Sequence, residues 1–191
     1  SNRKHDRNME QSKQITTKNN NEQTNILVQT FGDQKRWVNY RFETVDGKST
    51  KVPYAVTGRK ASSTDPSTWS MHEEAVRVSN QVGIMFSPDQ KLLGIDIDHC
   101  IKDGEILHEQ GEAIATLIRE ADTYSEISPS GTGLHLFLIV GELLPLLANK
   151  KAPFECYTSG RYFTVTGVSF GKPRLIRTVT KEEAHRLLAI I

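Results

Sequence analysis

The chain has 191 residues, 37% of them hydrophobic and 25% charged, with a formal net charge of +1. This composition is that of one soluble globular domain with its own core, and the near-neutral charge neither requires nor excludes a nucleic-acid partner. No segment approaches the roughly 20 consecutive apolar residues of a membrane span, so no membrane partner is expected. Two cysteines, Cys100 and Cys156, are too few for a disulfide scaffold or a four-thiolate zinc site. We expect reduced, partly buried thiols in a cytoplasmic protein.

Residues 1–24 are rich in Asn, Gln, Lys, Thr and Ser and contain hardly any apolar side chains. Such a segment cannot bury enough surface to offset its ordering entropy, so it is predicted to be a disordered polar tail. The ordered domain is predicted to span residues 25–191.

The first half of this domain alternates strand and turn signals, with one helix. A short helix or strand is predicted at 26–31. Alternating apolar and polar residues, with turn residues between them, predict strands at 36–42, 49–54, 82–86 and 92–98. A helix is predicted over 71–78, capped by Ser67 or Ser70. The large aromatic residues Trp37, Tyr40 and Trp69 are assigned to the core.

The second half is predicted to contain two longer helices, at 107–121 and at 181–188, the latter opened by a cap at Thr180. Strands are predicted at 124–127, 134–140, 154–157 and 161–166, and Thr158-Ser159-Gly160 is predicted to join the last two as a hairpin. Hairpins with interspersed helices indicate an α+β fold, in which helices pack on mainly antiparallel sheets.

The first chemical motif is Gly94-Ile95-Asp96-Ile97-Asp98. Residues two apart in a strand project from the same face, so Asp96 and Asp98 are expected to point together while the isoleucines enter a core. Two adjacent carboxylates repel unless a cation lies between them, and their hard oxygen atoms suit Mg²⁺ or Mn²⁺. The alternative is an acidic pair on a solvated strand face.

The second motif is Ser128-Pro129-Ser130-Gly131-Thr132-Gly133-Leu134-His135. A loop of small residues lets backbone N–H groups approach a phosphate, and the hydroxyls of Ser130 and Thr132 add donors. It is not a P-loop, because no lysine follows the second glycine. His135, at the start of the next strand, can donate to a triphosphate oxygen, although a structural histidine would fit the same position.

The third motif runs from Phe154 to Gly167 and contains Glu155, Arg161 and Tyr162. A three-residue hairpin loop would place Glu155 and Arg161 on one face, as a carboxylate for metal and a guanidinium for phosphate. A two-residue loop would put Tyr162 on that face instead. An ordinary hairpin with a cross-strand ion pair is the alternative.

Taken together and in this order, the three motifs resemble the archaeo-eukaryotic primase superfamily. The chain is most similar to the primase-polymerase domains found at the N-terminus of replication proteins of phages, plasmids and other mobile elements. The strings that carry this resemblance are TKVPYAVTGRKASSTDPSTW, GIDIDHC, YSEISPSGTGLHLF and ECYTSGRYFTVTG, within residues 36–167.

The resemblance implies an archaeo-eukaryotic primase fold, with an RRM-like catalytic module and a smaller N-terminal αβ module. It implies DNA-templated nucleotidyl transfer with two Mg²⁺ or Mn²⁺ ions, acting on dNTP or NTP, a single-stranded DNA template and a primer. A downstream helicase domain or helicase partner is also implied. Metal ligands are assigned to Asp96, Asp98 and Glu155, the last at a position where many relatives carry Asp. Nucleotide contacts are assigned to Lys51, Ser130, Gly131, Thr132, His135, Arg161 and Tyr162, and His135 is counted with the three carboxylates as catalytic.

Two other functions are compatible with parts of the sequence. A non-catalytic module that binds single-stranded nucleic acid would need exposed aromatic residues but no acidic cluster. A nuclease or a glycosyltransferase with an Asp-x-Asp motif would use the acidic pair, but neither accounts for the full ordered set of motifs.

Overall fold

The computed structural model describes residues 26–87, 91–107, 111–142 and 149–191, so the tail predicted at residues 1–24 lies outside the described residues. Residues 26–31 are helical. The elements that follow are β1 (Trp37–Val45), β2 (Lys48–Tyr54), a 3₁₀ turn (Pro66–Thr68), α2 (His72–Val78), β3 (Val82–Met85), β4 (Leu92–Ile97), β5 (Ile101–Lys102), β6 (Glu105–Ile106), α3 (Gly111–Ala121), β7 (Ser125–Ile127), β8 (Leu134–Val140), β9 (Asn149–Lys151), β10 (Phe154–Tyr157), β11 (Tyr162–Val165), β12 (Arg177–Val179) and α4 (Lys181–Leu188).

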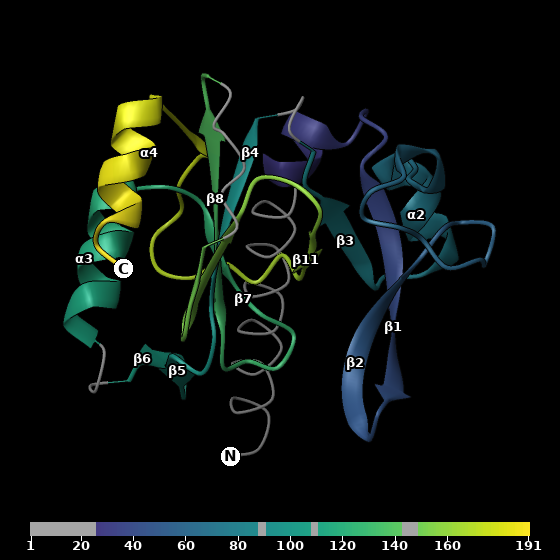
Figure 1. The fold of residues 1–191 in the computed structure, drawn as a ribbon, viewed down its shortest axis with the longest axis horizontal. Helices are drawn as coiled ribbons and strands as arrows, with labels where there is room; N and C mark the ends of the chain where they lie inside the picture. Colours follow the sequence, from purple (N-terminus) through teal and green to yellow (C-terminus); the bar gives the residue numbers. More distant parts are fainter. Residues whose placement is uncertain (1–25, 88–90, 108–110, 143–148) are drawn as a thin grey trace, which may run out of the picture.

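The strands form two main sheets. Sheet A has the strand order β11-β3-β1-β2, and sheet B has the order β12-β8-β4-β10-β9, with β7 also paired to β8 (Figure 1). Strands β5 and β6 make a separate two-stranded ribbon. Every strand pair is antiparallel except β12–β8. The fold is therefore α+β with mainly antiparallel sheets, as the sequence predicts.

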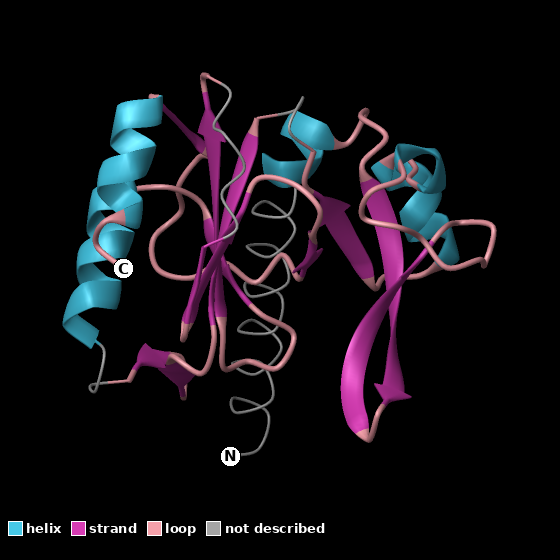
Figure 2. Ribbon diagram, viewed as in Figure 1, coloured by secondary structure: helices cyan, strands magenta, loops and turns pink. Residues whose placement is uncertain are grey.

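Sheet B is the middle layer of the molecule. Helices α3 and α4 cover one of its faces, and sheet A lies on its other side (Figure 2). The apolar residues Leu93, Ile95 and Ile97 of β4 are fully buried in the cluster shared with those helices. Because strand residues alternate between faces, Gly94 and Asp96 project from the opposite face, toward sheet A. The alternation in β4 thus separates the helix-covered core from the polar face.

A second cluster joins the two sheets and is largely aromatic. Phe86 and Phe163 from the sheet A side meet Phe137 and Tyr124 from the sheet B side. The ring centroids of Phe86 and Phe163 are 4.7 Å apart in an edge-to-face arrangement, a favoured geometry for aromatic pairs. Phe163 also meets Phe137 of β8, with ring centroids 5.9 Å apart, and this second contact packs β11 against sheet B.

The predicted hairpin of strands 154–157 and 161–166 is wrong. Strand β10 pairs with β4 and β9 in sheet B, whereas β11 pairs with β3 in sheet A. Residues 158–160 therefore cross from one sheet to the other. Alternation and turn residues identify strands but not their partners. Here each strand buries apolar side chains in a different cluster, since Cys156 lies in the helix-covered core and Phe163 between the sheets.

Two helix starts also differ from prediction. The N-cap of α2 is Met71, whose N–H donates to Glu74 Oε1, rather than Ser67 or Ser70. Ser67 lies in the 3₁₀ turn and Ser70 is buried in a bridge with Trp37. The described part of the helix predicted at 107–121 begins at Gly111, and Leu107 precedes it outside any helix.

The predictions of a cap at Thr180 and of buried side chains are confirmed. Thr180 caps α4 through its hydroxyl, which accepts from Glu183 N. The side chains of Trp37, Tyr40 and Trp69 are buried, and both cysteines are buried thiols that are not joined in a disulfide. Among the helices of the described ranges, each is too short or too polar to span a bilayer.

Candidate active site

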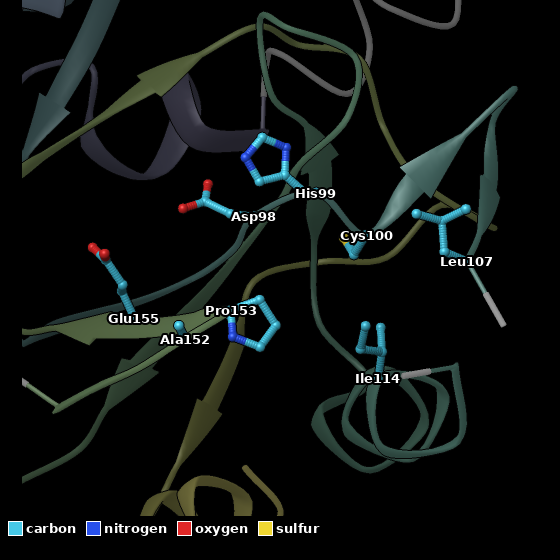
Figure 3. A pocket seen from close by; sticks show the side chains of 8 residues that line it. All are labelled: Asp98, His99, Cys100, Leu107, Ile114, Ala152, Pro153 and Glu155. Atoms are coloured by element: carbon cyan, nitrogen blue, oxygen red, sulfur yellow. The ribbon is translucent and has the colours of Figure 1, made fainter. Parts of the chain in front are cut away.

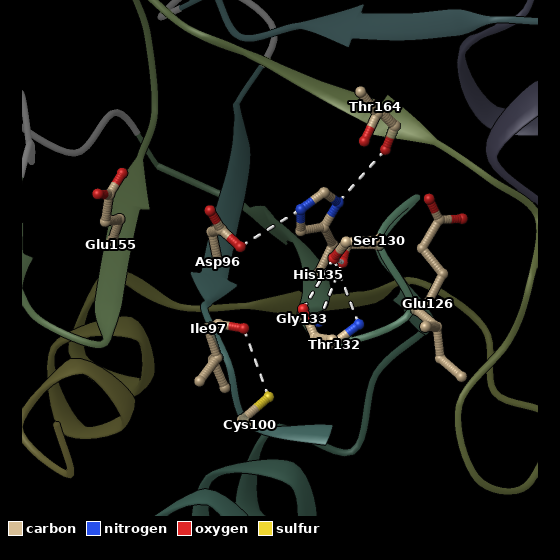
Figure 4. A network of polar contacts seen from close by, with 12 residues as sticks. Asp96, Ile97, Cys100, Glu126, Ser130, Thr132, Gly133, His135, Glu155 and Thr164 are labelled. Atoms are coloured by element: carbon tan, nitrogen blue, oxygen red, sulfur yellow. Dashed lines mark hydrogen bonds and ion pairs between the residues drawn. The ribbon is translucent and has the colours of Figure 1, made fainter. Parts of the chain in front are cut away.

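A row of polar side chains crosses sheet B on the face that points toward sheet A. Asp96 of β4 is directly opposite Glu155 of β10 on one side and His135 of β8 on the other. Glu126 of β7 is opposite His135. Directly opposed residues on neighbouring strands share a face, with their Cβ atoms about 4.5–5.5 Å apart. The strand register thus brings three residues of the three sequence motifs together (Figure 4).

His135 is held on both sides by oxygen atoms. Its Nε2 is 3.3 Å from Asp96 Oδ1, and its Nδ1 is 3.3 Å from the carbonyl oxygen of Thr164 (Figure 4). The ring also stacks on Phe163, with centroids 4.6 Å apart. Because a carbonyl oxygen can only accept, Nδ1 carries the hydrogen, and a proton on Nε2 would meet the Asp96 carboxylate. These contacts fix the orientation of the ring beside an acidic group.

Six of the residues assigned from sequence line one cavity of about 260 Å³ between the two sheets. They come from both sheets and from the crossing segment: Lys51, Asp96, His135, Glu155, Arg161 and Tyr162. The cavity therefore joins carboxylates and basic groups, the combination that a metal-bound triphosphate requires. Arg161 reaches it although the hairpin that was predicted to position it does not form.

Aromatic hydroxyls fix the walls of this cavity. Tyr157 donates from its hydroxyl to Glu155 Oε2 at 2.6 Å, and the Arg161 guanidinium lies over the Tyr157 ring, 5.0 Å from its centroid. Tyr162 donates to the carbonyl oxygen of Lys51 at 2.6 Å, which ties β11 to β2. Burial raises the pKa of Tyr157 to about 12, and the hydrogen bond to Glu155 acts in the same direction. Tyr157 therefore stays a hydrogen-bond donor at neutral pH.

Asp98 lies just beyond the end of β4 and lines an adjoining cavity of about 400 Å³ rather than the first. Glu155 lines both cavities. Figure 3 shows Asp98 and Glu155 on one side of the second cavity, with Leu107 and Ile114 on the other. Burial raises the pKa of Asp98, and the charges of Asp96 and Glu155 raise it further. The three predicted metal ligands are thus close enough to repel one another.

The donor set fits a hard divalent cation. Within the described ranges, no three His, Cys, Asp or Glu side chains are already arranged to hold one ion, so side chains must turn to complete a site. Two carboxylates on adjacent strands and a third that feels their charge are nevertheless the oxygen ligands that Mg²⁺ and Mn²⁺ prefer. A cation would remove the repulsion that raises the pKa of Asp98.

The small-residue loop is placed at the same end of sheet B as Asp98. The carbonyl oxygen of Thr132 accepts from Cys100 N at 2.8 Å and from Ile101 N at 3.0 Å. Ser130, Gly131 and Thr132 are exposed, and Gly131 has a φ of +77°, which favours glycine.

The backbone N–H groups of this loop do not point outward toward a phosphate site. The N–H groups of Gly131, Thr132 and Gly133 donate to Ser128 O, Ser130 Oγ and Ser128 Oγ, respectively. The hydroxyls of Ser130 and Thr132 remain on the surface. Nucleotide binding by this loop therefore stays a prediction, and it would depend more on hydroxyls than on backbone N–H groups.

Sequence reasoning missed Glu126, which is fully buried. Its carboxylate accepts from the Tyr124 hydroxyl at 2.6 Å, from Thr166 N at 2.8 Å and from Gly167 N at 3.2 Å. Burial raises the pKa of Glu126, and these three donors oppose the shift. Through these bonds Glu126 anchors the residues that follow β11. Thr164 of β11 itself orients His135 through its carbonyl oxygen. The position of Glu126 within a strand, seven residues before the loop's last glycine, gives only a weak sequence signal.

An α+β domain with a carboxylate pair on adjacent antiparallel strands, a neighbouring strand-borne histidine and converging basic groups has the site layout of the primase-polymerase class. Comparison with known proteins agrees. The chain is 37% identical over 155 residues to the DNA primase-polymerase of Nitratiruptor phage NrS-1, a match that covers 75% of this chain and 20% of the phage protein. No family model matches the chain. The chain belongs to the primase-polymerase family, and it spans about a fifth of the length of this relative.

Proposed function

We propose that this domain catalyses template-directed transfer of nucleotides onto a primer by a two-metal mechanism, in the replication of a phage or another mobile element. The observation that carries the proposal is the cavity in which Asp96, Glu155 and His135 meet Lys51 and Arg161. Sheet B with α3 and α4 would be the RRM-like catalytic module, and sheet A with α2 the smaller module.

The proposed metal ligands are Asp96, Glu155 and Asp98. Two Mg²⁺ or Mn²⁺ ions bound there would activate the primer 3′-hydroxyl and stabilise the leaving pyrophosphate. The carboxylates supply position and charge, and the chemistry requires no covalent nucleophile. The Tyr157 hydroxyl, which donates to Glu155 Oε2, restricts rotation of that carboxylate.

The nucleotide would be held by the basic wall of the cavity. His135 lies beside Asp96, and its Nε2 would donate to a triphosphate oxygen once the Asp96 carboxylate turned toward a metal ion. Arg161 and Lys51 enter the same cavity and would neutralise the remaining phosphate charge. Tyr162, fixed through its hydroxyl, offers its ring to the sugar or base of a dNTP or NTP. The substrates would be completed by a primer and a single-stranded DNA template.

A binding module without catalysis explains the site less well. Asp96, Glu155 and buried Glu126 lie in one row on the face toward the cavity, and carboxylates repel phosphate unless cations neutralise them. Metal ions bound for catalysis would neutralise this acidic row and would explain its place beside a phosphate site. A helicase partner or domain is proposed only from the resemblance to replication proteins.

The test is primer extension on a primed single-stranded template with dNTP and Mg²⁺ or Mn²⁺, measured with pyrophosphate release. Asp96→Asn is expected to lower extension on the order of 100-fold or more, because the amide is a poor metal ligand. Asp122→Asn is the matched control, since Asp122 is an exposed carboxylate paired with Arg174. Equal extension by the wild type and Asp96→Asn, or release of mononucleotides from DNA without pyrophosphate, would overturn the proposal.

A further inference from the structure

The hairpin of β1 and β2 extends beyond the body of the domain and exposes an aromatic ring. Figure 1 shows the two strands projecting past the rest of sheet A. Phe42, near the middle of β1, is 55% exposed, and its ring meets that of Tyr40 edge to face with centroids 5.8 Å apart. An exposed ring that a neighbouring ring supports offers a flat apolar face on which a base can stack.

The two faces of this hairpin differ in chemistry. The register pairs Tyr40 with Pro53, Phe42 with Lys51 and Thr44 with Ser49, and alternation puts these six residues on one face, which we call the Phe42 face. The Phe42 face contains aromatic, hydroxyl and basic side chains and no carboxylate.

On the opposite face the charged groups contact other residues of the same hairpin. Tyr54 donates from its hydroxyl to Glu43, and the Arg41 guanidinium lies 4.1 Å from the centroid of the Tyr54 ring. The acidic residue of the paired strands is therefore directed away from the Phe42 face. This separation leaves the Phe42 face free of the negative charge that would repel a polyanion.

The Phe42 face is continuous with the candidate active site. Tyr162 is paired with Met85 in sheet A. A Cβ atom added at Gly83 would come within 2.7 Å of the Tyr162 ring, so the ring covers Gly83. Gly83 is directly opposite Val38, so the Tyr162 ring lies on the face of sheet A that these two residues share. Val38, Tyr40 and Phe42 alternate along β1 and share that face. Tyr162 and Lys51 both line the active-site cavity. Phe42, directly opposite Lys51, thus lies next to the cavity's rim.

We propose that the Phe42 face binds the single-stranded DNA template as it approaches the active site. Phe42 stacks on an unpaired base beside the entrance to the nucleotide cavity, which Lys51 lines. The inference rests on the proposed function, because it identifies the surface that would deliver a template to that site. A single strand fits better than a duplex, because paired bases in a duplex are already stacked and cannot offer a face to an aromatic ring.

The test is the affinity of the whole chain for a fluorescein-labelled oligothymidine, measured by anisotropy in EDTA so that binding is independent of the metal site. Phe42→Leu keeps an apolar side chain but removes the stacking ring, and is expected to weaken binding roughly 5- to 100-fold. Phe42→Tyr should restore most of the affinity. Val45→Ala is the matched control, because Val45 is 46% exposed and lies on the other face of the same hairpin. The thermal midpoint of each variant shows that it is folded.

Three results would overturn the inference: no binding of oligothymidine by the wild type, equal binding by the wild type and Phe42→Leu, or an equal loss in Val45→Ala. Primer extension by the wild type and Asp96→Asn, run in parallel, separates this inference from the proposed function. Asp96-dependent extension with Phe42-independent DNA binding contradicts the inference alone. Phe42-dependent DNA binding without any extension contradicts the proposed function alone.

Discussion

Gly94→Ala should destabilise the protein by disturbing the contact between the two sheets. Gly94 lies in β4 on the face toward sheet A, two residues before Asp96. A Cβ atom there would be 2.3 Å from Phe86 Cζ and 2.5 Å from Phe163 Cε2, more than 1 Å inside ordinary contact distance. Both rings are packed in the inter-sheet cluster, so they cannot move freely. Overpacking of this kind costs about 1–3 kcal/mol.

The displacement should also reach the active site, because Phe163 stacks on His135. For a chain of this size, about 1–3 kcal/mol corresponds to a thermal midpoint lowered by about 2–12 °C. Thermal and urea unfolding followed by circular dichroism measure the change, and dNTP binding measures the effect on His135. Gly111→Ala is the matched control. Among the described residues, its Cβ would meet Ile106 Cγ2 alone, at 4.0 Å, and alanine favours the helix, so stability should be unchanged or slightly higher. An unchanged midpoint in Gly94→Ala would refute the close packing of the two sheets at β4.

Two further substitutions probe the acidic groups. Asp98→Asn should stabilise the metal-free protein by up to about 1 kcal/mol, a small value because the side chain is exposed, while it weakens Mn²⁺ binding measured by calorimetry. The pKa of Asp98 is higher in the folded protein than in the unfolded chain. The metal-free wild type should therefore lose stability as the pH rises from the pKa of the unfolded chain to that of the folded protein. Asp98→Asn should flatten this dependence, whereas Mn²⁺ affinity of the wild type should increase over the same range. Glu126→Ala should cost about 3 kcal/mol or more in urea unfolding, because the Tyr124 hydroxyl and two backbone N–H groups lose their acceptor.

Each of these expectations has a contrary outcome. A lower midpoint for metal-free Asp98→Asn would mean that Asp98 does not repel Asp96 and Glu155. Unchanged Mn²⁺ affinity would mean that Asp98 is not a metal ligand. Glu126→Gln, which retains one acceptor oxygen, should lose less stability than Glu126→Ala. Equal losses in the two variants would show that the volume of the side chain matters rather than its hydrogen bonds.

Local patterns in the sequence were sufficient to predict most elements and several site residues. The strand around Asp96 follows from its alternating isoleucines, which are fully buried on the helix side. The α+β class follows from the order of elements. The convergence of Lys51 with the acidic residues was inferred from resemblance to a family, since Lys51 is far from them in the chain. Arg161 and Tyr162 were placed beside Glu155 by the register of a hairpin that does not form.

What could not be predicted depends on which strands are neighbours. The turn residues between β10 and β11 indicate a reversal of the chain, but they do not reveal that the two strands join different sheets. For the same reason, neither motif reveals that Glu155 lies directly opposite Asp96. Glu126 and Phe42 were missed because alternation does not tell whether a polar residue is buried or an aromatic one exposed.

The measurement that addresses the metal site itself is anomalous diffraction from crystals grown with Mn²⁺ and a non-hydrolysable dNTP. The account predicts Mn²⁺ peaks within coordination distance of the Asp96 and Glu155 carboxylates, with the triphosphate between them and His135 or Arg161. Nucleotide bound with Mn²⁺ at another place, and neither carboxylate in contact with a metal, would contradict the account.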